Sequence, residues 1–118
     1  MAWTGETGGR VVGSPASVSE TVFVGSEDGS VYAFAADGRG ERWTFETDDA
    51  VLASVAVGAG LVYAGSRDGR LYALDARHGT ERWVRGLSGP VVYSSPAVVD
   101  GELFVGTIDG ALHGLIDS

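Results

Sequence analysis

The sequence predicts an all-β fold, an array of four-stranded antiparallel meander sheets, and three observations support this prediction. The stretch VFVGSEDGSVYAFAADGRGERW at 22–43 is written again at 62–83 as VYAGSRDGRLYALDARHGTERW. Within each copy, an Asp-Gly pair separates two short apolar segments. Glycine and tryptophan recur at intervals of about 40 residues, at Gly25, Gly65 and Gly106 and at Trp3, Trp43 and Trp83. A period of this length is typical of solenoids, propellers and other repeat arrays.

Each Asp-Gly pair is predicted to form the turn of a β-hairpin. Because Asp and Gly tolerate positive φ, the pair favours a two-residue type I′ turn. In the strand that follows the turn, both alternating sets of side chains are largely apolar, as at 71–74 (Leu-Tyr-Ala-Leu). A strand of this kind is buried on both faces. The sheets are therefore expected to stack face to face, as the blades of a β-propeller do. The three turns are Asp28-Gly29, Asp68-Gly69 and Asp109-Gly110.

The other two strands of each unit flank this hairpin. The approach to the first strand aligns at 11–14, 51–54 and 92–95, and that strand ends in a turn at 19–20, 59–60 or 100–101. The fourth strand begins with Glu-Arg-Trp, at 41–43 and 81–83. Residues 1–118 are thus predicted to form one propeller repeat array, with three repeats at about 3–42, 43–82 and 83–118. It holds the fourth strand of one blade, two complete blades and three strands of another.

Composition narrows the classes of function. The formal net charge is −8, from eight Arg against sixteen Asp and Glu, and the chain has no Lys, Asn, Gln or Cys. The acidic balance argues against a nucleic-acid partner, and the absence of Cys excludes disulfides and thiol chemistry. An excess of acidic residues without any Lys predicts a protein that works in high salt, where the repulsion between its negative charges is screened. Codon bias in a GC-rich genome is the alternative explanation of this composition.

Targeting signals are not visible in the sequence. Residues 1–10 lack a basic stretch followed by an apolar one, so no signal peptide is expected. The longest uncharged run, 50–66, is too short for a membrane span and contains Ser and Gly. The cellular compartment stays open at this point.

Two stretches carry a resemblance to a known family. SPAVVDGELFVGTIDGALHGL at 95–115, together with DARHGTERW at 75–83, resembles the blade repeat of the pyrroloquinoline-quinone-type (quinoprotein) β-propellers. The resemblance implies that a stretch of the form Ala-x-Asp-x-x-x-Gly-x-x-x-Trp docks one blade onto the next through the tryptophan ring. The matching residues of the second copy are Ala73, Asp75, Gly79 and Trp83; 34–37 and Gly40 match more loosely, and the third copy ends before its Trp.

The same resemblance implies what an enzyme of the family would need. Quinoprotein dehydrogenases use a catalytic Asp, a Ca²⁺ site with Glu and Asn ligands, and often a disulfide of adjacent cysteines above the cofactor. This chain has no Asn and no Cys. We therefore expect it not to be an enzyme, and we predict no catalytic, cofactor-binding or metal-binding residues.

Several repeated residues invite a chemical role, and each has a plainer structural one. Asp28, Asp68 and Asp109 could form a carboxylate ring for a hard cation, but Asp before Gly is ordinary turn chemistry. The recurring Ser14, Ser54 and Ser95 could suggest a nucleophile, yet no base accompanies them. Repetition favours a shared structural hydrogen bond.

Histidine and tryptophan are weighed in the same way. His113 stands where Tyr32 and Tyr72 stand, which predicts an aromatic packing residue, while His78 lies in a loop without a second ligand. The tryptophans with Arg42 and Arg82 could form a stacking platform for ligands. Their strict period instead predicts rings packed between blades.

The sequence therefore predicts a non-catalytic propeller scaffold that presents loops for binding a protein or peptide. The Asp-Gly turns and the connections Thr47–Ala50 and Arg85–Pro90 are expected to share one rim. Because three repeats are too few to close a ring, we expect a head-to-tail homodimer in which Trp3 packs into the third blade of its partner. The alternative is a fragment of a larger quinone-dependent dehydrogenase or sensor propeller.

Overall fold

The computed structural model describes residues 5–91, 97–99, 102–107 and 109–116. Within them the chain forms eleven strands in three antiparallel sheets and no helix, so none that could cross a membrane. The first sheet consists of β1 (Ala16–Val18), β2 (Thr21–Gly25), β3 (Ser30–Ala35) and β4 (Glu41–Glu46). The second consists of β5 (Ala56–Gly58), β6 (Leu61–Gly65), β7 (Arg70–Asp75) and β8 (Glu81–Gly86). The third consists of β9 (Ala97–Val99), β10 (Glu102–Gly106) and β11 (Leu112–Ile116).

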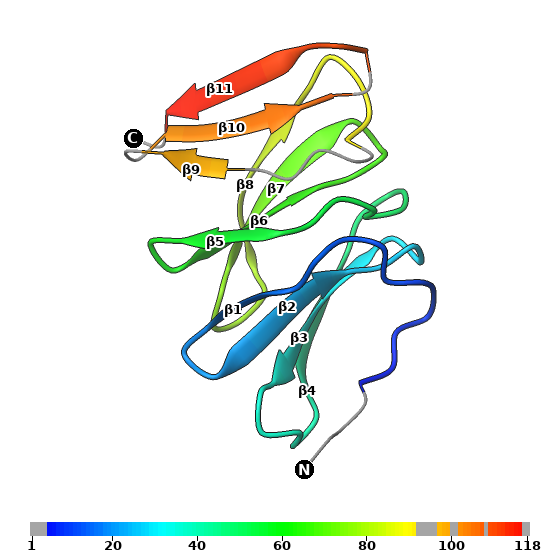
Figure 1. Ribbon diagram of the computed structural model, residues 1–118, viewed down its shortest axis with the longest axis vertical. Coiled ribbons are helices and arrows are strands. Elements are labelled where there is room, and N and C mark those ends of the chain that lie inside the picture. Colours follow the sequence, from blue (N-terminus) through cyan, green and yellow to red (C-terminus); the bar gives the residue numbers. More distant parts are fainter. Residues whose placement is uncertain (1–4, 92–96, 100–101, 108, 117–118) are drawn as a thin grey trace.

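Each sheet is a meander in which consecutive strands pair, which confirms the all-β prediction. The first two sheets share the same strand register. Thr21 of β2 pairs with Ala35 of β3, and the residues 40 positions later, Leu61 of β6 and Asp75 of β7, pair in the same way. The three sheets stack along the chain, with β1, β5 and β9 following one another on one side of the stack (Figure 1). Trp43 and Trp83 lie in the last strands of the first and second sheets, so the unit counted from Trp43 to Trp83 bridges two sheets.

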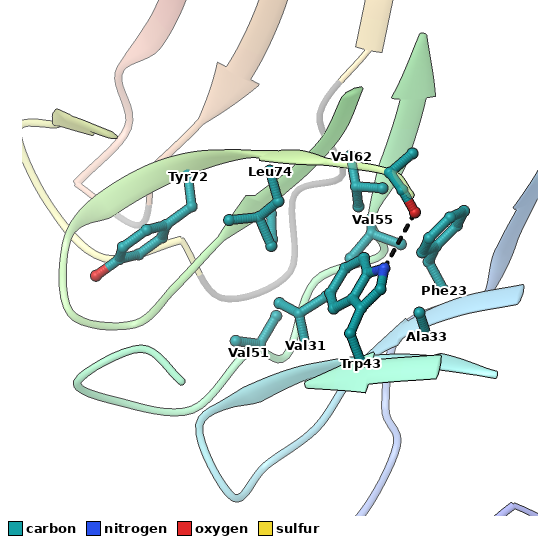
Figure 2. Close-up of a cluster of buried hydrophobic side chains, with 11 residues drawn as sticks. Phe23, Val31, Ala33, Trp43, Val51, Val55, Val62, Tyr72 and Leu74 are labelled. Atoms are coloured by element: carbon teal, nitrogen blue, oxygen red, sulfur yellow. Dashed lines mark hydrogen bonds between the residues drawn. The ribbon is translucent and has the colours of Figure 1, made fainter. Parts of the chain in front are cut away.

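Two apolar cores lie between the sheets. The first joins Phe23, Val31 and Trp43 of the first sheet to Val62 and Leu74 of the second (Figure 2). The second core joins the second sheet to the third, and its members include Leu61, Tyr63, Leu71, Ala73, Leu103 and Val105. Alternate residues of β7 therefore serve different cores, which confirms that this strand is buried on both faces.

Trp43 is the main contact between the first two sheets. Its ring is 8% exposed, and its Nε1 donates a hydrogen bond of 3.0 Å to the carbonyl oxygen of Ala76 (Figure 2). A Cβ on Gly79 would overlap the ring, and the φ of Gly79 is +72°, so only glycine suits this position. The docking role predicted for the Asp75–Gly79 stretch is confirmed for this tryptophan.

Trp83 is less enclosed than Trp43. It packs beside Tyr63, with ring centroids 6.0 Å apart, and lies partly buried against the second core. The prediction of a mostly buried ring therefore holds for Trp83 too, although its residue is the more accessible of the two. The counterpart of the Ala76–Gly79 loop would begin at about residue 117 in the third repeat, outside the described residues. Trp3 also lies outside the described residues.

The prediction of type I′ turns at the Asp-Gly pairs is wrong. Only the glycine has positive φ there, +95° at Gly29, while Asp28 does not. The N–H of Gly29 bonds to the Ser26 carbonyl oxygen, which makes a type I turn closed by a left-handed glycine. Consecutive positive φ values, the mark of type I′, occur instead between the first two strands of each complete sheet, at Ser19 and Glu20 and at Ala59 and Gly60.

The sequence alignment that pairs 92–95 with 51–54 is also off by one position at the residue that corresponds to Val51. Val51 packs over Gly25 and donates its N–H to the Ser26 carbonyl oxygen. Val91 makes the same contacts with Gly65 and Ser66 and is therefore the counterpart of Val51. The extra residue of the third repeat therefore falls after Val91.

Candidate functional site

The Asp-Gly rim is the end of the sheets formed by the three Asp-Gly turns and the connections Thr47–Ala50 and Arg85–Pro90. The N–H of Thr47 donates to the carbonyl oxygen of Gly29 at 2.7 Å, and the N–H of Leu87 donates to that of Gly69 at 2.8 Å. The turns and connections therefore share one rim, as the sequence predicted. Each connection rests on the turn of the sheet that it leaves.

The Asp28 carboxylate links its own hairpin to the segment before the first sheet. It accepts hydrogen bonds of 2.9 Å from the N–H groups of Ser30 and Gly8, and a third from the hydroxyl of Tyr32. An aspartate that accepts the N–H two residues ahead is typical of turns. The bond to Gly8 ties the segment before the first sheet to the Asp28-Gly29 turn.

The next two aspartates repeat this arrangement. Asp68 accepts from the N–H groups of Arg70 (2.8 Å) and Asp48 (3.2 Å) and from the Tyr72 hydroxyl (2.5 Å). Asp109 accepts from the N–H of Ala111 at 3.2 Å and from the Thr107 hydroxyl at 2.5 Å. All three carboxylates thus hold their own turns.

His113 occupies the tyrosine position in the third sheet, as predicted, but it forms polar contacts there. Its Nε2 lies 2.9 Å from the Ser88 hydroxyl and 3.4 Å from that of Thr107. Sequence reasoning missed these polar contacts. The spacing of four residues from Asp to Tyr was a signal for the hydrogen bonds within the first two hairpins, from Tyr32 to Asp28 and from Tyr72 to Asp68. The residue at the same position in the third hairpin, His113, contacts Ser88 and Thr107 instead.

The electrostatics of the rim fit structural hydrogen bonding. Partial burial raises the pKa of Asp28, but donors led by Tyr32 and the Ser30 N–H outweigh it and lower the pKa overall. Hydrogen bonds from Thr107 and Ser88 lower the pKa of Asp109. Burial and the bond to Asp68 raise the pKa of Tyr72 to about 12. At neutral pH these carboxylates are therefore charged acceptors and Tyr72 is a protonated donor.

The other candidate residues are placed as follows. In the described part of the chain, no three His, Asp or Glu side chains group closely enough to hold a metal ion. The Ser54 hydroxyl accepts the N–H of Ser14 at 2.6 Å, which confirms a structural hydrogen bond between two units, while Ser95 lies outside the described residues. His78 is exposed in the β7–β8 loop, with Nδ1 3.4 Å from Asp75.

A cavity at the opposite end of the first two sheets was not anticipated from the sequence. It has a volume of about 870 Å³ and lies between the β1–β2 turn, the β5–β6 turn and the β7–β8 loop. Three of its lining residues are arginines, namely Arg42, Arg77 and Arg82; we call it the arginine cavity. The repeated Glu-Arg-Trp was the available signal. In each of the first two sheets, that arginine is the extra residue of a β-bulge.

Comparison with known proteins gives the family and the fold. A sequence profile described as outer membrane protein assembly factor BamB matches residues 27–116. Quinohemoprotein alcohol dehydrogenase ADHIIG from Pseudomonas putida HK5 is similar in structure, with a TM-score of 0.84 and 25% identity over 96% of this chain. The quinohemoprotein alcohol dehydrogenase of Comamonas testosteroni matches with a TM-score of 0.75 and 26% identity over 95% of this chain.

A europium-containing methanol dehydrogenase, with a TM-score of 0.78 and 24% identity over 96% of the chain, adds only a likeness of fold. The chain spans 20%, 19% and 22% of the lengths of these three structures, in the order given. No curated protein sequence matches it.

Proposed function

Because the chain belongs to the family of PQQ-like propeller repeats whose profile is that of the assembly factor BamB, we propose that it is a non-catalytic propeller scaffold. Its sheets complete a ring by packing against a second copy of the chain, and its Asp-Gly rim binds a protein or peptide. Two chains of three sheets give a closed ring of six blades, within the size range of propellers. A family fold by itself specifies no activity, so the proposal rests on the surfaces of this chain.

The observation that carries the proposal is the exposure of Leu112. This side chain is 74% exposed at the start of β11, whereas Val31 and Leu71, at the same position in β3 and β7, are 0% exposed. Both of those residues are covered by the next sheet. The outer face of the third sheet therefore presents the kind of surface that the first two sheets bury.

The first sheet presents the complementary element. Val51 and Val91 are fully buried, each over a glycine of the preceding sheet, Gly25 and Gly65. Val11 is their counterpart before the first sheet and is 46% exposed. In the proposed dimer, Val11 of one copy lies over the outer face of the third sheet of the other. The contact is head to tail, and it closes after two copies.

The binding role of the Asp-Gly rim is supported by a difference between framework and loops. The turns repeat their hydrogen bonds in all three sheets. The connections vary in their side-chain contacts. In the first connection the Thr47 hydroxyl bonds to that of Ser66. In the second connection Leu87 stands at the position of Thr47, and the next residue, Ser88, bonds to the Thr107 hydroxyl. Variable loops on a fixed scaffold are a common location of binding residues.

Light scattering coupled to size exclusion tests the dimer. The wild-type chain of 12.2 kDa is expected to elute at about twice that mass. Leu112→Asp and Val11→Asp each break one contact surface and should give monomers. Val84→Asp, at an exposed apolar residue of β8, is the matched control and should stay dimeric. An equimolar mixture of Leu112→Asp and Val11→Asp retains one intact contact and should recover a dimer.

A folded wild-type monomer at micromolar concentration would contradict self-association, as would a Leu112→Asp chain that remains dimeric. If the monomer is instead completed by further blades of a longer chain, adding one more repeat after residue 118 should bury Leu112 without dimerisation.

A second candidate function, part of a larger quinone-dependent dehydrogenase, is favoured by the likeness to the Pseudomonas enzyme over 96% of this chain. It is tested by adding pyrroloquinoline quinone and Ca²⁺ to the protein. A micromolar complex with a bound chromophore and a raised melting temperature would support this function over the non-catalytic scaffold.

A further inference from the structure

We infer that the arginine cavity between the first two sheets binds an acidic peptide segment that also carries apolar side chains. This site lies at the opposite end of the strands from the Asp-Gly rim, and it involves neither of the surfaces proposed for self-association.

The cavity gathers positive charge in a chain that is otherwise acidic. Three of the eight arginines of the sequence line it. None of the three forms an ion pair with a carboxylate of the described residues, whereas Arg10, Arg39 and Arg70 each do. Guanidinium groups recognise carboxylates through paired hydrogen bonds. The three unpaired arginines are therefore available to an anionic ligand.

The one carboxylate that lines the cavity, Asp75, is held mainly by its own loop, and the attraction of Arg82 is the smallest of the effects that lower its pKa. Asp75 Oδ1 accepts from the N–H groups of Arg77 (2.8 Å) and His78 (3.1 Å) and lies near the imidazole of His78. It thereby shapes the β7–β8 loop, which presents Arg77. The cavity keeps an excess of positive charge, since one acid faces three arginines.

The size and lining of the cavity favour a peptide over a small inorganic anion. A volume of about 870 Å³ is within the range of sites for organic ligands and far larger than a single phosphate needs. Val18, Ala59 and Ala76 give the lining an apolar part, and Ser19 and Thr21 add hydroxyl groups. An acidic peptide segment with an aromatic or aliphatic side chain matches the guanidinium, apolar and hydroxyl parts of this lining.

The arrangement follows from the repeat architecture. The bulge in the first sheet sets Trp43 opposite Ala33 and Glu41 opposite Phe34, so Arg42 is the unpaired residue between them. Bulges redirect side chains from the ordinary alternation of a strand. The bulge thus places Arg42 at the edge of the sheet interface that Trp43 fills.

Fluorescence anisotropy with the 118-residue chain tests the inference. The probe is a fluorescein-labelled acetyl-Glu-Phe-Glu-Phe-Glu amide, and its Gln-for-Glu analogue is the charge control. Arg42→Gln with Arg82→Gln should weaken binding of the acidic probe at least tenfold, because two of three guanidiniums are lost. Arg10→Gln with Arg39→Gln removes two exposed arginines that line neither the cavity nor the Asp-Gly rim and should change the affinity less than twofold.

Arg77→Gln, at an exposed loop position, serves as a second variant if the double variant fails to fold. Raising the salt concentration should weaken binding of the acidic probe and leave the affinity for the Gln analogue unchanged. The inference is overturned if the acidic probe does not saturate, if the cavity variants bind it like wild type, or if the Gln analogue binds equally well. Competition by inorganic phosphate at the same concentration as the peptide would also overturn it, in favour of a simple anion site.

Discussion

β7 and β11 occupy the same place in their sheets, but the surroundings of their side chains differ. Leu71 in β7 lies between two cores and is inaccessible to solvent, whereas Leu112 in β11 is the most exposed of the large apolar residues that the structure describes. The two strands start alike, with Leu two residues after the glycine of an Asp-Gly turn. Burial in this array is therefore a property of the neighbouring sheet rather than of the strand itself.

Trp43 and Trp83 extend this comparison to the contacts between sheets. Trp43 is closed in by the loop of the next sheet and bonded to Ala76, while Trp83 has only part of such an environment. Trp43 and Trp83 both follow Glu-Arg in the sequence, but we therefore expect them to contribute unequally to the stability of the fold.

The largest effect is expected for Trp43→Ala. Removing a large buried ring and its hydrogen bond should lower the free energy of unfolding by about 3 kcal/mol or more, and Trp83→Ala should lower it clearly less. Urea unfolding followed by circular dichroism measures both. Equal losses in the two variants would show that the two rings are equally important, in spite of their different surroundings.

A smaller effect is expected for Asp68→Ala on the Asp-Gly rim. The change leaves two backbone N–H groups and the Tyr72 hydroxyl without their acceptor. A loss of about 1–3 kcal/mol in unfolding free energy is typical when partly buried donors become unsatisfied. Asp37→Ala, which removes an exposed aspartate paired with Arg39, is the matched control and should cost under about 1 kcal/mol. If the two variants lost the same unfolding free energy, the hydrogen bonds of Asp68 to Asp48 and Tyr72 would contribute nothing beyond its role in the turn.

Salt is expected to stabilise the chain as a whole. With sixteen acidic residues against eight arginines, the folded state concentrates negative charge that added ions screen. The melting temperature should rise between low salt and molar KCl, measured by differential scanning fluorimetry. A flat profile would remove the prediction of adaptation to high salt and leave codon bias as the explanation of the composition.

The smallest effect concerns the titration of Tyr72. Its pKa of about 12 in the folded chain is above the ordinary value of 10.0. The folded state therefore holds this proton more tightly, so its contribution to stability is complete below pH 10 and is lost as the pH rises towards 12. Absorbance of tyrosinate should show a late component that Tyr72→Phe removes. An unchanged titration curve in that variant would assign the late component to another tyrosine.

Much of the architecture was predictable from the sequence because period and turn residues are local signals. Hairpins flanking Asp28, Asp68 and Asp109 and the docking of Trp43 follow from that pattern. The turn type was not predictable from the dipeptide alone: Ser26 and Gly29 close a longer loop in which Asp28 acts through its side chain. The type I′ turns fell at Ser19-Glu20 and Ala59-Gly60, where pairing of the adjacent strands imposes positive φ on Ser19, Glu20 and Ala59, which do not favour it.

The candidate site was less predictable than the fold. A hydrogen bond such as that from Ser14 to Ser54 joins residues 40 positions apart, and repetition alone indicated it. The arginine cavity combines Arg42, Arg77 and Thr21, which lie in two sheets and are related by no spacing in the sequence. The degree of burial of Trp83 also depends on how the third sheet packs against the second, which no local pattern specifies.

Hydrogen–deuterium exchange at two protein concentrations tests most directly whether a second copy buries the outer face of the third sheet. The amides of 112–114 should exchange more slowly as the concentration rises through the dimerisation range, while those of 71–74, already between two sheets, should not change. Slower exchange confined to 112–114 and to the neighbourhood of Val11 is the result expected for the head-to-tail dimer. Exchange at 112–114 that is fast and independent of concentration, in a chain that remains folded, would contradict it.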